Sequence, residues 1–261
     1  MVFNRYVDAQ DPLPGAHTAL TEPNGFVAWG RDLSVARLEE AYRKGIFPWG
    51  PSDEENAVFW WSPNPRMVLL TDQLRISRSL RKRLRQIETQ QKSSDAPSYI
   101  VKVDTAFQAV MTACALRTPE GQQETWITQN LLNTYTSWHH KGQAHSIELW
   151  KQDPLTGNQL VGGLYGVSLG RMFFGESMFS FETNASKIAL AYLVSFLRQH
   201  NVHMIDCQVH SPHLASLGAI EIDRSDFITH IQKAQRAPEL PWASGWLDAE
   251  GALHRDETVF P

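Results

Sequence analysis

The sequence has little cysteine, no long apolar run and no strong excess of charge, and each shortage excludes a class of protein. Its two cysteines, Cys114 and Cys207, cannot build the disulfide framework of a small secreted domain. No apolar run approaches the roughly 20 residues that a membrane-spanning helix requires. The opening residues MVFNRYVDAQDPLPG lack a basic start followed by an apolar core, which argues against a secretory signal. We therefore predict a cytoplasmic protein with two buried free thiols.

A net charge of −4 excludes a chain that is basic along its whole length, but one segment departs from this balance. Residues 75–86, RISRSLRKRLRQ, contain no acidic side chain and six basic ones, namely Arg75, Arg78, Arg81, Lys82, Arg83 and Arg85. If this segment is helical, its cations lie three or four positions apart on overlapping faces. A phosphate-binding patch and a solvated helix face both fit this pattern, which by itself favours neither.

The segment HMIDCQVHSPH (203–213) gathers His, Asp and Cys side chains as a metal site would. Its run MIDCQV predicts a strand, which places Asp206 and Gln208 on one polar face and Cys207 on the opposite, apolar face. Asp206 and Cys207 could not easily hold one ion, and no further ligand follows at the spacing typical of zinc sites. We therefore expect no metal here, and a polar strand end exposed in a cleft.

The order of elements predicts a mixed α/β fold with two domains. We place a small N-terminal α/β domain at residues 1–65, since the two prolines of SPNPR mark a boundary. Residues 66–261 form the larger domain, in which a three-strand meander is followed by a helix, a strand and a further helix. The polar segment 88–98 is expected to be a loop, and the Pro- and Gly-rich end of the chain an irregular tail.

The predicted layout of the larger domain is similar to that of the GNAT-type N-acyltransferases. Those enzymes bind the pyrophosphate of acyl-CoA through a Gly-rich turn between the fourth strand and the next helix. Here the corresponding segment, MFSFETNASK, contains no glycine, so the backbone cradle for a CoA pyrophosphate is missing. Asn184 or Thr183 is expected to cap the helix that follows. The layout therefore indicates an acyltransferase-like sheet whose acyl donor is not CoA.

Several stretches, in one order and spread over roughly residues 20–240, resemble a single family of enzymes. They are EPNGFVAWGRDLS, GIFPWG, FWWSPNPR, TWIT, HSIELW, VGGLYGV, FFGESMFS, NASKIAL and IDCQVHSPHLASLGA. Together they are similar to the leucyl/phenylalanyl-tRNA–protein transferase family, whose members transfer Leu or Phe, and Met less well, from aminoacyl-tRNA to proteins that begin with Arg or Lys. The resemblance implies a small N-terminal domain, a GNAT-like catalytic domain, no metal and no cofactor. It also implies a role in the N-end rule pathway of protein degradation.

The resemblance assigns the chemistry to the IDCQ motif, that is, to Asp206 and Gln208. Aminoacyl-tRNA is an activated ester, so attack by a peptide α-amine needs alignment and oxyanion stabilisation rather than a covalent enzyme intermediate. We expect Asp206 to hold the side-chain amide of Gln208, whose carbonyl accepts a hydrogen bond from the attacking amine. A structural cap for the following turn is the alternative role of Asp206.

Other residues are assigned to the two substrates by the same resemblance. Glu176 is expected to pair with the basic side chain of the acceptor, and a surface carboxylate is the alternative. The Leu, Phe or Met side chain of the donor requires an apolar pocket, for which Phe173, Met178 and Ile205 are candidates. Leu190 is a further candidate, although core packing is favoured for it.

The end of the tRNA requires aromatic and basic contacts. Trp49 and Trp126 are expected to stack on the terminal adenine, whereas Trp60 and Trp61 are assigned to the core. The acceptor-stem backbone is assigned to the basic segment, with the central cations Arg81, Lys82 and Arg83. The chain departs from the family pattern at Phe181, where an Arg is common, and in the length of segment 88–98.

Two other functions are also compatible with the sequence. One is an enzyme of the same fold that uses acyl-CoA, and the other is a tRNA-binding module without catalysis. Transfer of a labelled acyl group to a peptide that begins with Arg would separate all three. Nothing in the sequence indicates an obligate oligomer, so we expect a monomer.

Overall fold

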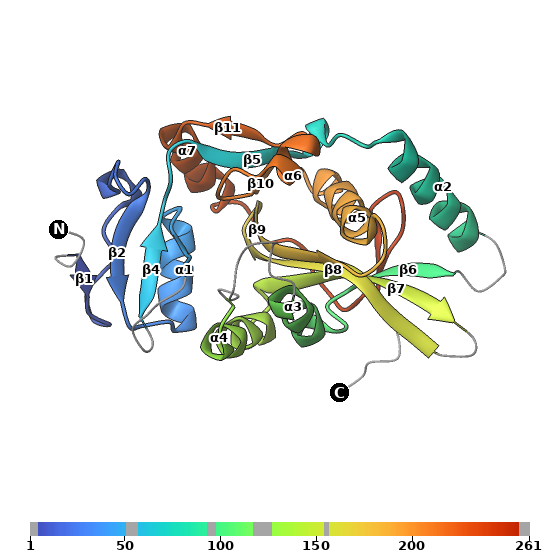
Figure 1. Ribbon diagram of the computed structural model, residues 1–261, viewed down its shortest axis with the longest axis horizontal. Coiled ribbons are helices and arrows are strands. Elements are labelled where there is room, and N and C mark those ends of the chain that lie inside the picture. Colours follow the sequence, from blue (N-terminus) through green and yellow to red (C-terminus); the bar gives the residue numbers. More distant parts are fainter. Residues whose placement is uncertain (1–4, 51–56, 93–97, 117–126, 154–156, 256–261) are drawn as a thin grey trace.

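The computed structural model describes residues 5–50, 57–92, 98–116, 127–153 and 157–255, and its architecture is mixed α/β (Figure 1). The strands of these residues form a smaller sheet, in the order β1-β2-β4-β3, and a larger one, in the order β11-β5-β10-β9-β8-β7-β6-β12-β13. The predicted mixed α/β class is therefore confirmed. The strands of the smaller sheet precede residue 62 and the larger sheet begins at Arg66, while the domain boundary at residue 65 stays a prediction.

The smaller sheet lies at the N-terminal end of the molecule and carries one helix. Its strands are β1 (Tyr6–Val7), β2 (Phe26–Gly30), β3 (Phe47–Pro48) and β4 (Val58–Trp61). Helix α1 (Val35–Arg43) begins after Ser34, whose hydroxyl accepts from the backbone N–H of Arg37 at 3.2 Å. Beyond the helix, Gly45 has a φ of +73°, a conformation that suits glycine and turns the chain into β3. The turn leads to residues 47–49, which line a cavity together with residues of the larger sheet.

The larger sheet is built around the predicted meander. Its strands are β5 (Arg66–Leu70), β6 (Tyr99–Val103), β7 (Ala144–Asp153), β8 (Gly157–Leu169), β9 (Met172–Ser180), β10 (Met204–Asp206), β11 (Ile220–Ile222), β12 (Gly245–Leu247) and β13 (Leu253–Arg255). Strands β6 to β9 are antiparallel neighbours, whereas β10 runs parallel to β9 after the crossover through a helix. The expected irregular C-terminal tail is wrong in part, because β12 pairs with β6 and extends the sheet.

Helices cover both faces of the larger sheet (Figure 1). They are α2 (Arg78–Lys92), α3 (Phe107–Leu116), α4 (Gln129–His140), α5 (Ala185–Gln199), α6 (Pro212–Ser216) and α7 (Arg224–Ala234), with short 3-10 turns at Ala16–Thr18 and Thr71–Gln73. Buried side chains of α3 and α4 form one core and those of α5 a second core on the other face. The expected loop at 88–98 is wrong for residues 88–92, which continue α2, and residues 93–97 lie outside the described residues.

None of the helices in the described ranges has both the length and the apolar character that crossing a membrane would demand. Both cysteines are free thiols, as predicted, with Cys114 buried and Cys207 half-buried. Burial raises the pKa of the Cys114 thiol to about 12, so this thiol is protonated at neutral pH.

Helix α5 approaches strand β8 closely, because Gly162 has no side chain. A Cβ at this position would clash with the Cβ of Ala185 and would lie 2.9 Å from the Ala185 carbonyl carbon. The first turn of α5 therefore rests directly on the strand.

We expect Gly162→Ala to lower the free energy of unfolding by about 1–3 kcal/mol, since the added methyl overpacks this contact. Urea titration of wild type and variant measures the difference. Asn158→Ala, on the exposed part of the same strand, serves as the control and should change stability by less than about 0.5 kcal/mol. Equal stability of Gly162→Ala and wild type would contradict the close approach.

Candidate active site

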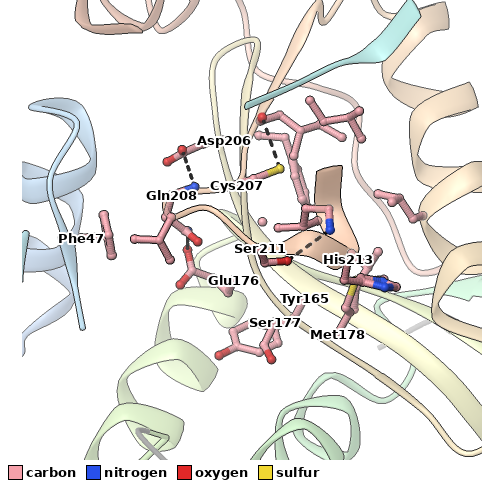
Figure 2. Close-up of a pocket in the computed structure, with 18 of the residues that line it drawn as sticks. Phe47, Tyr165, Glu176, Ser177, Met178, Asp206, Cys207, Gln208, Ser211 and His213 are labelled. Atoms are coloured by element: carbon pink, nitrogen blue, oxygen red, sulfur yellow. Dashed lines mark hydrogen bonds between the residues drawn. The ribbon is translucent and has the colours of Figure 1, made fainter. Parts of the chain in front are cut away.

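A cavity of about 350 Å³ opens between strands β9 and β10, and residues 47–49 form one of its walls. Phe47 lies at one side of this space (Figure 2). Its lining is mainly apolar and includes Phe47, Leu69, Leu164, Phe173, Met178, Leu190, Leu193, Ile205 and Leu214. Glu176 and Gln208 lie close together on one side of this space, and Met178 and His213 lie on the other. An apolar cavity with a few convergent polar groups is typical of a site for a small apolar ligand group.

Glu176 reaches the cavity through a bulge in strand β9. Gly175 pairs with Gly166 and Ser177 pairs with Tyr165, so Glu176 is one extra residue between two consecutive pairs. The bulge explains how an acid flanked by apolar residues is directed into the site. Its side chain is half-buried there rather than displayed on the surface of the sheet.

Three donors surround the Glu176 carboxylate. The Tyr42 hydroxyl donates to Oε1 at 2.6 Å and the Tyr135 hydroxyl to Oε2 at 3.3 Å. The side-chain amide of Gln208 donates to Oε1 at 3.2 Å. These donors come from α1, α4 and the segment after β10, so three segments that are distant in the sequence meet at this carboxylate.

The pKa of Glu176 is raised to about 7. Burial is the main cause, because it disfavours the charged carboxylate; the hydrogen bond from Tyr42 acts in the opposite direction, and the nearby Asp206 raises the pKa further. A carboxyl group with this pKa changes its charge near neutral pH. Such a group can bind a cation or take up a proton under ordinary conditions.

Asp206 and Gln208 do not share a strand face, contrary to the prediction. Strand β10 ends at Asp206, and Gln208 has a φ of +57°, so the alternation of side chains stops between them. Asp206 is fully buried and forms a two-pronged ion pair with Arg66, at 2.7 Å to Nε and 2.6 Å to the Nη2 atom. The expected contact between Asp206 and the side-chain amide of Gln208 is therefore wrong. Asp206 Oδ1 instead accepts from the backbone N–H of Gln208 at 3.0 Å.

All four apolar residues predicted for the donor side chain line the cavity. Phe173 and Ile205 are buried walls of the space, and Met178 is half-buried at its far side. Leu190 also lines it, and it is buried in the core on that face of the sheet, as expected. The sequence alone did not identify Arg66, Tyr42 or Tyr135. Arg66 carried a signal, since a cation that begins an apolar strand is buried only with a partner.

Trp49 stands at the mouth of the cavity. Its side chain is 40% exposed, and its ring meets the edge of Trp61 with centroids 5.9 Å apart. Trp60 is buried, as predicted, whereas Trp61 is only half-buried and donates from its indole N–H to the Trp49 carbonyl at 2.8 Å. Trp126 lies outside the described residues.

Residues 78–86 of the predicted basic segment lie in helix α2, at the opposite end of the larger sheet from α7, while Arg75 precedes the helix (Figure 1). Leu80 and Ile87 form the buried face of this helix, while its side chains Arg81 and Lys82 are exposed. The guanidinium of Arg83 lies over the Tyr99 ring, 4.2 Å from its centre. A shallow surface hollow runs along the basic side chains Arg78, Arg81, Lys82, Arg83 and Arg85.

A second hollow links α2 to the turn before α5. Lys82 and Arg83 line it together with the exposed Phe181 and with Asn184. Asn184 occupies the N-cap position of α5, as expected, but its side chain makes no capping hydrogen bond in the described structure. Over the described ranges, no group of three or more His, Cys, Asp or Glu side chains is arranged to hold a metal ion.

Comparison with known proteins identifies relatives along nearly the whole chain. The family described as leucyl/phenylalanyl-tRNA protein transferase matches residues 68–232, and the N-terminal domain of the same family matches residues 31–64. The leucyl/phenylalanyl-tRNA–protein transferase of Bordetella avium is 50% identical over 95% of this chain and 96% of its own length. The proteins of the same name from Cupriavidus necator and Burkholderia pseudomallei are 49% and 46% identical, each over 91% of this chain, and over 91% and 89% of their own lengths.

A likeness to a solved structure is weak. L-PGS from Bacillus licheniformis aligns with 71% of this chain and 54% of its own, with 12% identity and a TM-score of 0.33.

The raised pKa of Glu176 makes the stability of the protein depend on pH. The folded carboxyl titrates at about 7 against 4.5 for the ordinary group, so the stability that the neutral form confers is complete below pH 4.5 and is lost as the pH rises through 7. We expect Glu176→Gln, which stays neutral, to gain stability relative to wild type by ~1–3 kcal/mol between pH 5 and pH 8. Urea unfolding of both proteins across this range measures the gain, and a difference that does not change with pH would contradict it.

Proposed function

The chain belongs to the leucyl/phenylalanyl-tRNA–protein transferase family, and we propose that it transfers Leu or Phe, and Met less well, from aminoacyl-tRNA to proteins that begin with Arg or Lys. The observation that carries this proposal is the apolar cavity beside Glu176 and Gln208, within a chain that matches both parts of the family. The products would enter the N-end rule pathway. A cytoplasmic location and a monomeric state stay predictions.

The reaction is aminolysis of an ester and needs no covalent enzyme intermediate. The acceptor α-amine attacks the carbonyl carbon of the aminoacyl ester, the C–O bond to the tRNA ribose breaks, and a peptide bond forms. One amine proton leaves, and the ribose oxygen gains one. A free α-amine has a pKa of about 8, so a useful fraction is neutral near pH 7. The site therefore has to align the two substrates and accept hydrogen bonds from the amine.

Gln208 and Glu176 are suited to hold the amine. The Gln208 side-chain amide donates its N–H to Glu176, a contact that fixes the orientation of the whole amide group. Its carbonyl oxygen is an acceptor and can receive an N–H of the attacking amine. Glu176 titrates near neutral pH beside it and can receive the proton that the amine loses.

The cavity is suited to an unbranched or aromatic donor side chain. Its walls are apolar, and the flexible thioether of Met178 can adapt to Leu, Phe or Met. β-branched donors fit this space less well, although one methyl group changes discrimination by only ~1–3 kcal/mol.

Glu176 also supports the preference for a basic acceptor. Among the described residues, Glu176 and Asp206 are the acidic side chains that line the cavity. Asp206 is already paired with Arg66, so Glu176 is the carboxylate that remains for a cationic acceptor. We propose that this attraction selects Arg and Lys at the acceptor N-terminus.

The tRNA would be bound at two places. Trp49, exposed at the mouth of the cavity, can stack on the terminal adenine, a contact worth ~1–3 kcal/mol per base. The exposed cations of α2 can contact the phosphates of the acceptor stem. Such contacts read charge and shape rather than base sequence.

The use of acyl-CoA is disfavoured by the start of α5. The backbone N–H of Ala185 donates to the Glu182 carbonyl at 3.1 Å, and that of Ser186 donates to the Ser180 hydroxyl at 2.8 Å. These N–H groups are therefore not free to bind a pyrophosphate.

Labelled transfer tests the proposal directly. We expect the purified protein to join labelled Phe from Phe-tRNA to a peptide that begins with Arg, and to leave the same peptide unmodified when its α-amine is acetylated. Acetyl-CoA should support no transfer to either peptide. Transfer from acetyl-CoA alone, or from neither donor, would refute the proposal.

The role of α2 is tested by tRNA binding as a function of salt. We expect Arg81→Ala combined with Arg83→Ala to weaken binding and to reduce the slope of log K against log salt by about 1–2, since two phosphate contacts are lost. Lys233→Ala combined with Arg236→Ala removes two exposed cations from α7 or just beyond it, and should leave the slope unchanged. An equal effect of the two pairs would contradict a specific role for α2.

A further inference from the structure

Arg66 is a buried cation at the place where the smaller sheet, the larger sheet and α7 meet. Its residue exposure is 1%, and it begins strand β5, which pairs with β10 and β11. Its guanidinium lies between two aromatic rings, 4.6 Å from the centre of Phe47 and 4.5 Å from that of Phe227. These rings belong to β3 of the smaller sheet and to α7, so the guanidinium contacts aromatic side chains from two different parts of the fold.

The guanidinium donates in two directions. Its Nε and one terminal nitrogen bind the two oxygens of Asp206, at 2.7 and 2.6 Å. The other terminal nitrogen donates to the Gly45 carbonyl at 3.2 Å, in the turn that leads to Phe47 and Trp49. The Arg66 side chain therefore binds Asp206, two residues before Gln208, and also the turn that leads to the cavity wall at residues 47–49.

Asp206 connects Arg66 to Gln208 through a further hydrogen bond. Its Oδ1 atom accepts the backbone N–H of Gln208 at 3.0 Å, and Gln208 holds the left-handed conformation that non-glycine residues seldom adopt. Two further hydrogen bonds fix the segment beside Arg66, from Cys207 N to Met67 O at 2.9 Å and from Met67 N to Gln208 O at 3.2 Å. The direction of the Gln208 side chain is set by this backbone conformation.

We propose that Arg66 is a positioning residue of the transfer reaction, which acts through Asp206 on Gln208 and through Gly45 and Phe47 on the wall that carries Trp49. This inference rests on the proposed function. Asp206 then serves as the fixed anion of a buried pair and not as a proton acceptor. Both of its oxygens are occupied by protein donors and neither is exposed, so a substrate amine cannot reach them.

A stabilising role alone is the competing explanation, and paired substitutions separate the two. Arg66→Met leaves Asp206 buried without a partner and is expected to lower the Tm by about 10 °C. Arg66→Met combined with Asp206→Leu removes both charges and should recover most of that loss. The double variant still lacks the bonds to Gln208 N and Gly45 O. We therefore expect its kcat to stay about 100-fold below wild type, with a raised KM for Phe-tRNA.

Arg66→Lys provides a variant that keeps the charge. The lysine ammonium is compact and cannot donate to both Asp206 oxygens and to the Gly45 carbonyl at once, as the planar guanidinium of arginine does. We expect Arg66→Lys to remain folded but to lose kcat by at least about 10-fold. Arg37→Met is the matched control, since Arg37 is also buried, pairs with Asp32 and Glu40, and lies outside the residues that line the cavity. It should lower the Tm and leave kcat unchanged at a temperature where it is folded.

Nuclear magnetic resonance can detect the coupling between Arg66 and Gln208 without a measurement of turnover. With glutamine labelled by ¹⁵N, the backbone amide of Gln208 is identified by its loss in Gln208→Glu. This signal should shift in Arg66→Met, Arg66→Lys and the double variant, and stay in place in Arg37→Met.

Recovery of both kcat and the Gln208 signal in the stable double variant would overturn the positioning role, as would an unchanged Gln208 signal in Arg66→Met. If wild type transferred no amino acid while the Gln208 signal responded as expected, the proposed function would fail and the coupling of Arg66 to Gln208 would stand.

Discussion

A charged side chain is stable inside a protein only if the fold supplies a partner of opposite charge. At the junction of the two sheets, the buried side chain of Arg66 therefore depends on Asp206, and Asp206 depends on Arg66. Strand β5 supplies the cation, β10 supplies the anion, and the rings of Phe47 and Phe227 close the space around the guanidinium. The cavity lies directly beside this junction. Its polar corner at Gln208 and its wall at Phe47 are both in contact with members of the pair.

The protein separates two kinds of recognition in space. The cavity is apolar and is the proposed site of the donor side chain, whereas the cations of α2 lie outside it. Under the proposed function, a chain of net charge −4 attracts the polyanionic tRNA through cations concentrated on one helix. Glu176 lies among hydroxyl and amide donors, and under the proposed function its charge attracts a second, basic substrate.

Local periodicity was enough to predict much of the fold from the sequence. The meander β7 to β9, the helix α5 and the helix α1 follow from alternating or helical spacing. Periodicity fails where the chain leaves regular structure, as at Gln208, whose left-handed backbone ends the alternation that placed it beside Asp206. It also gives no information on contacts between distant segments. The partner of Asp206 lies 140 residues away, and strand β12 forms because β6 offers a free edge.

The bulge at Glu176 reverses which residues of β9 face the cavity. Before it, Phe174 packs into the core with α3 and α4 while Phe173 faces the other side; after it, Phe179 joins that same core and Met178 packs on the cavity side. Phe173 before the bulge and Met178 after it therefore lie on the same face of the sheet, although one number is odd and the other even. Deletion of Glu176 would restore simple alternation with the same pairs to β8, so Met178 and Phe179 would keep their faces while the cavity lost the Glu176 carboxyl group. The bulge thus adds a carboxyl group to an otherwise apolar wall without changing the strand pairing on either side of it.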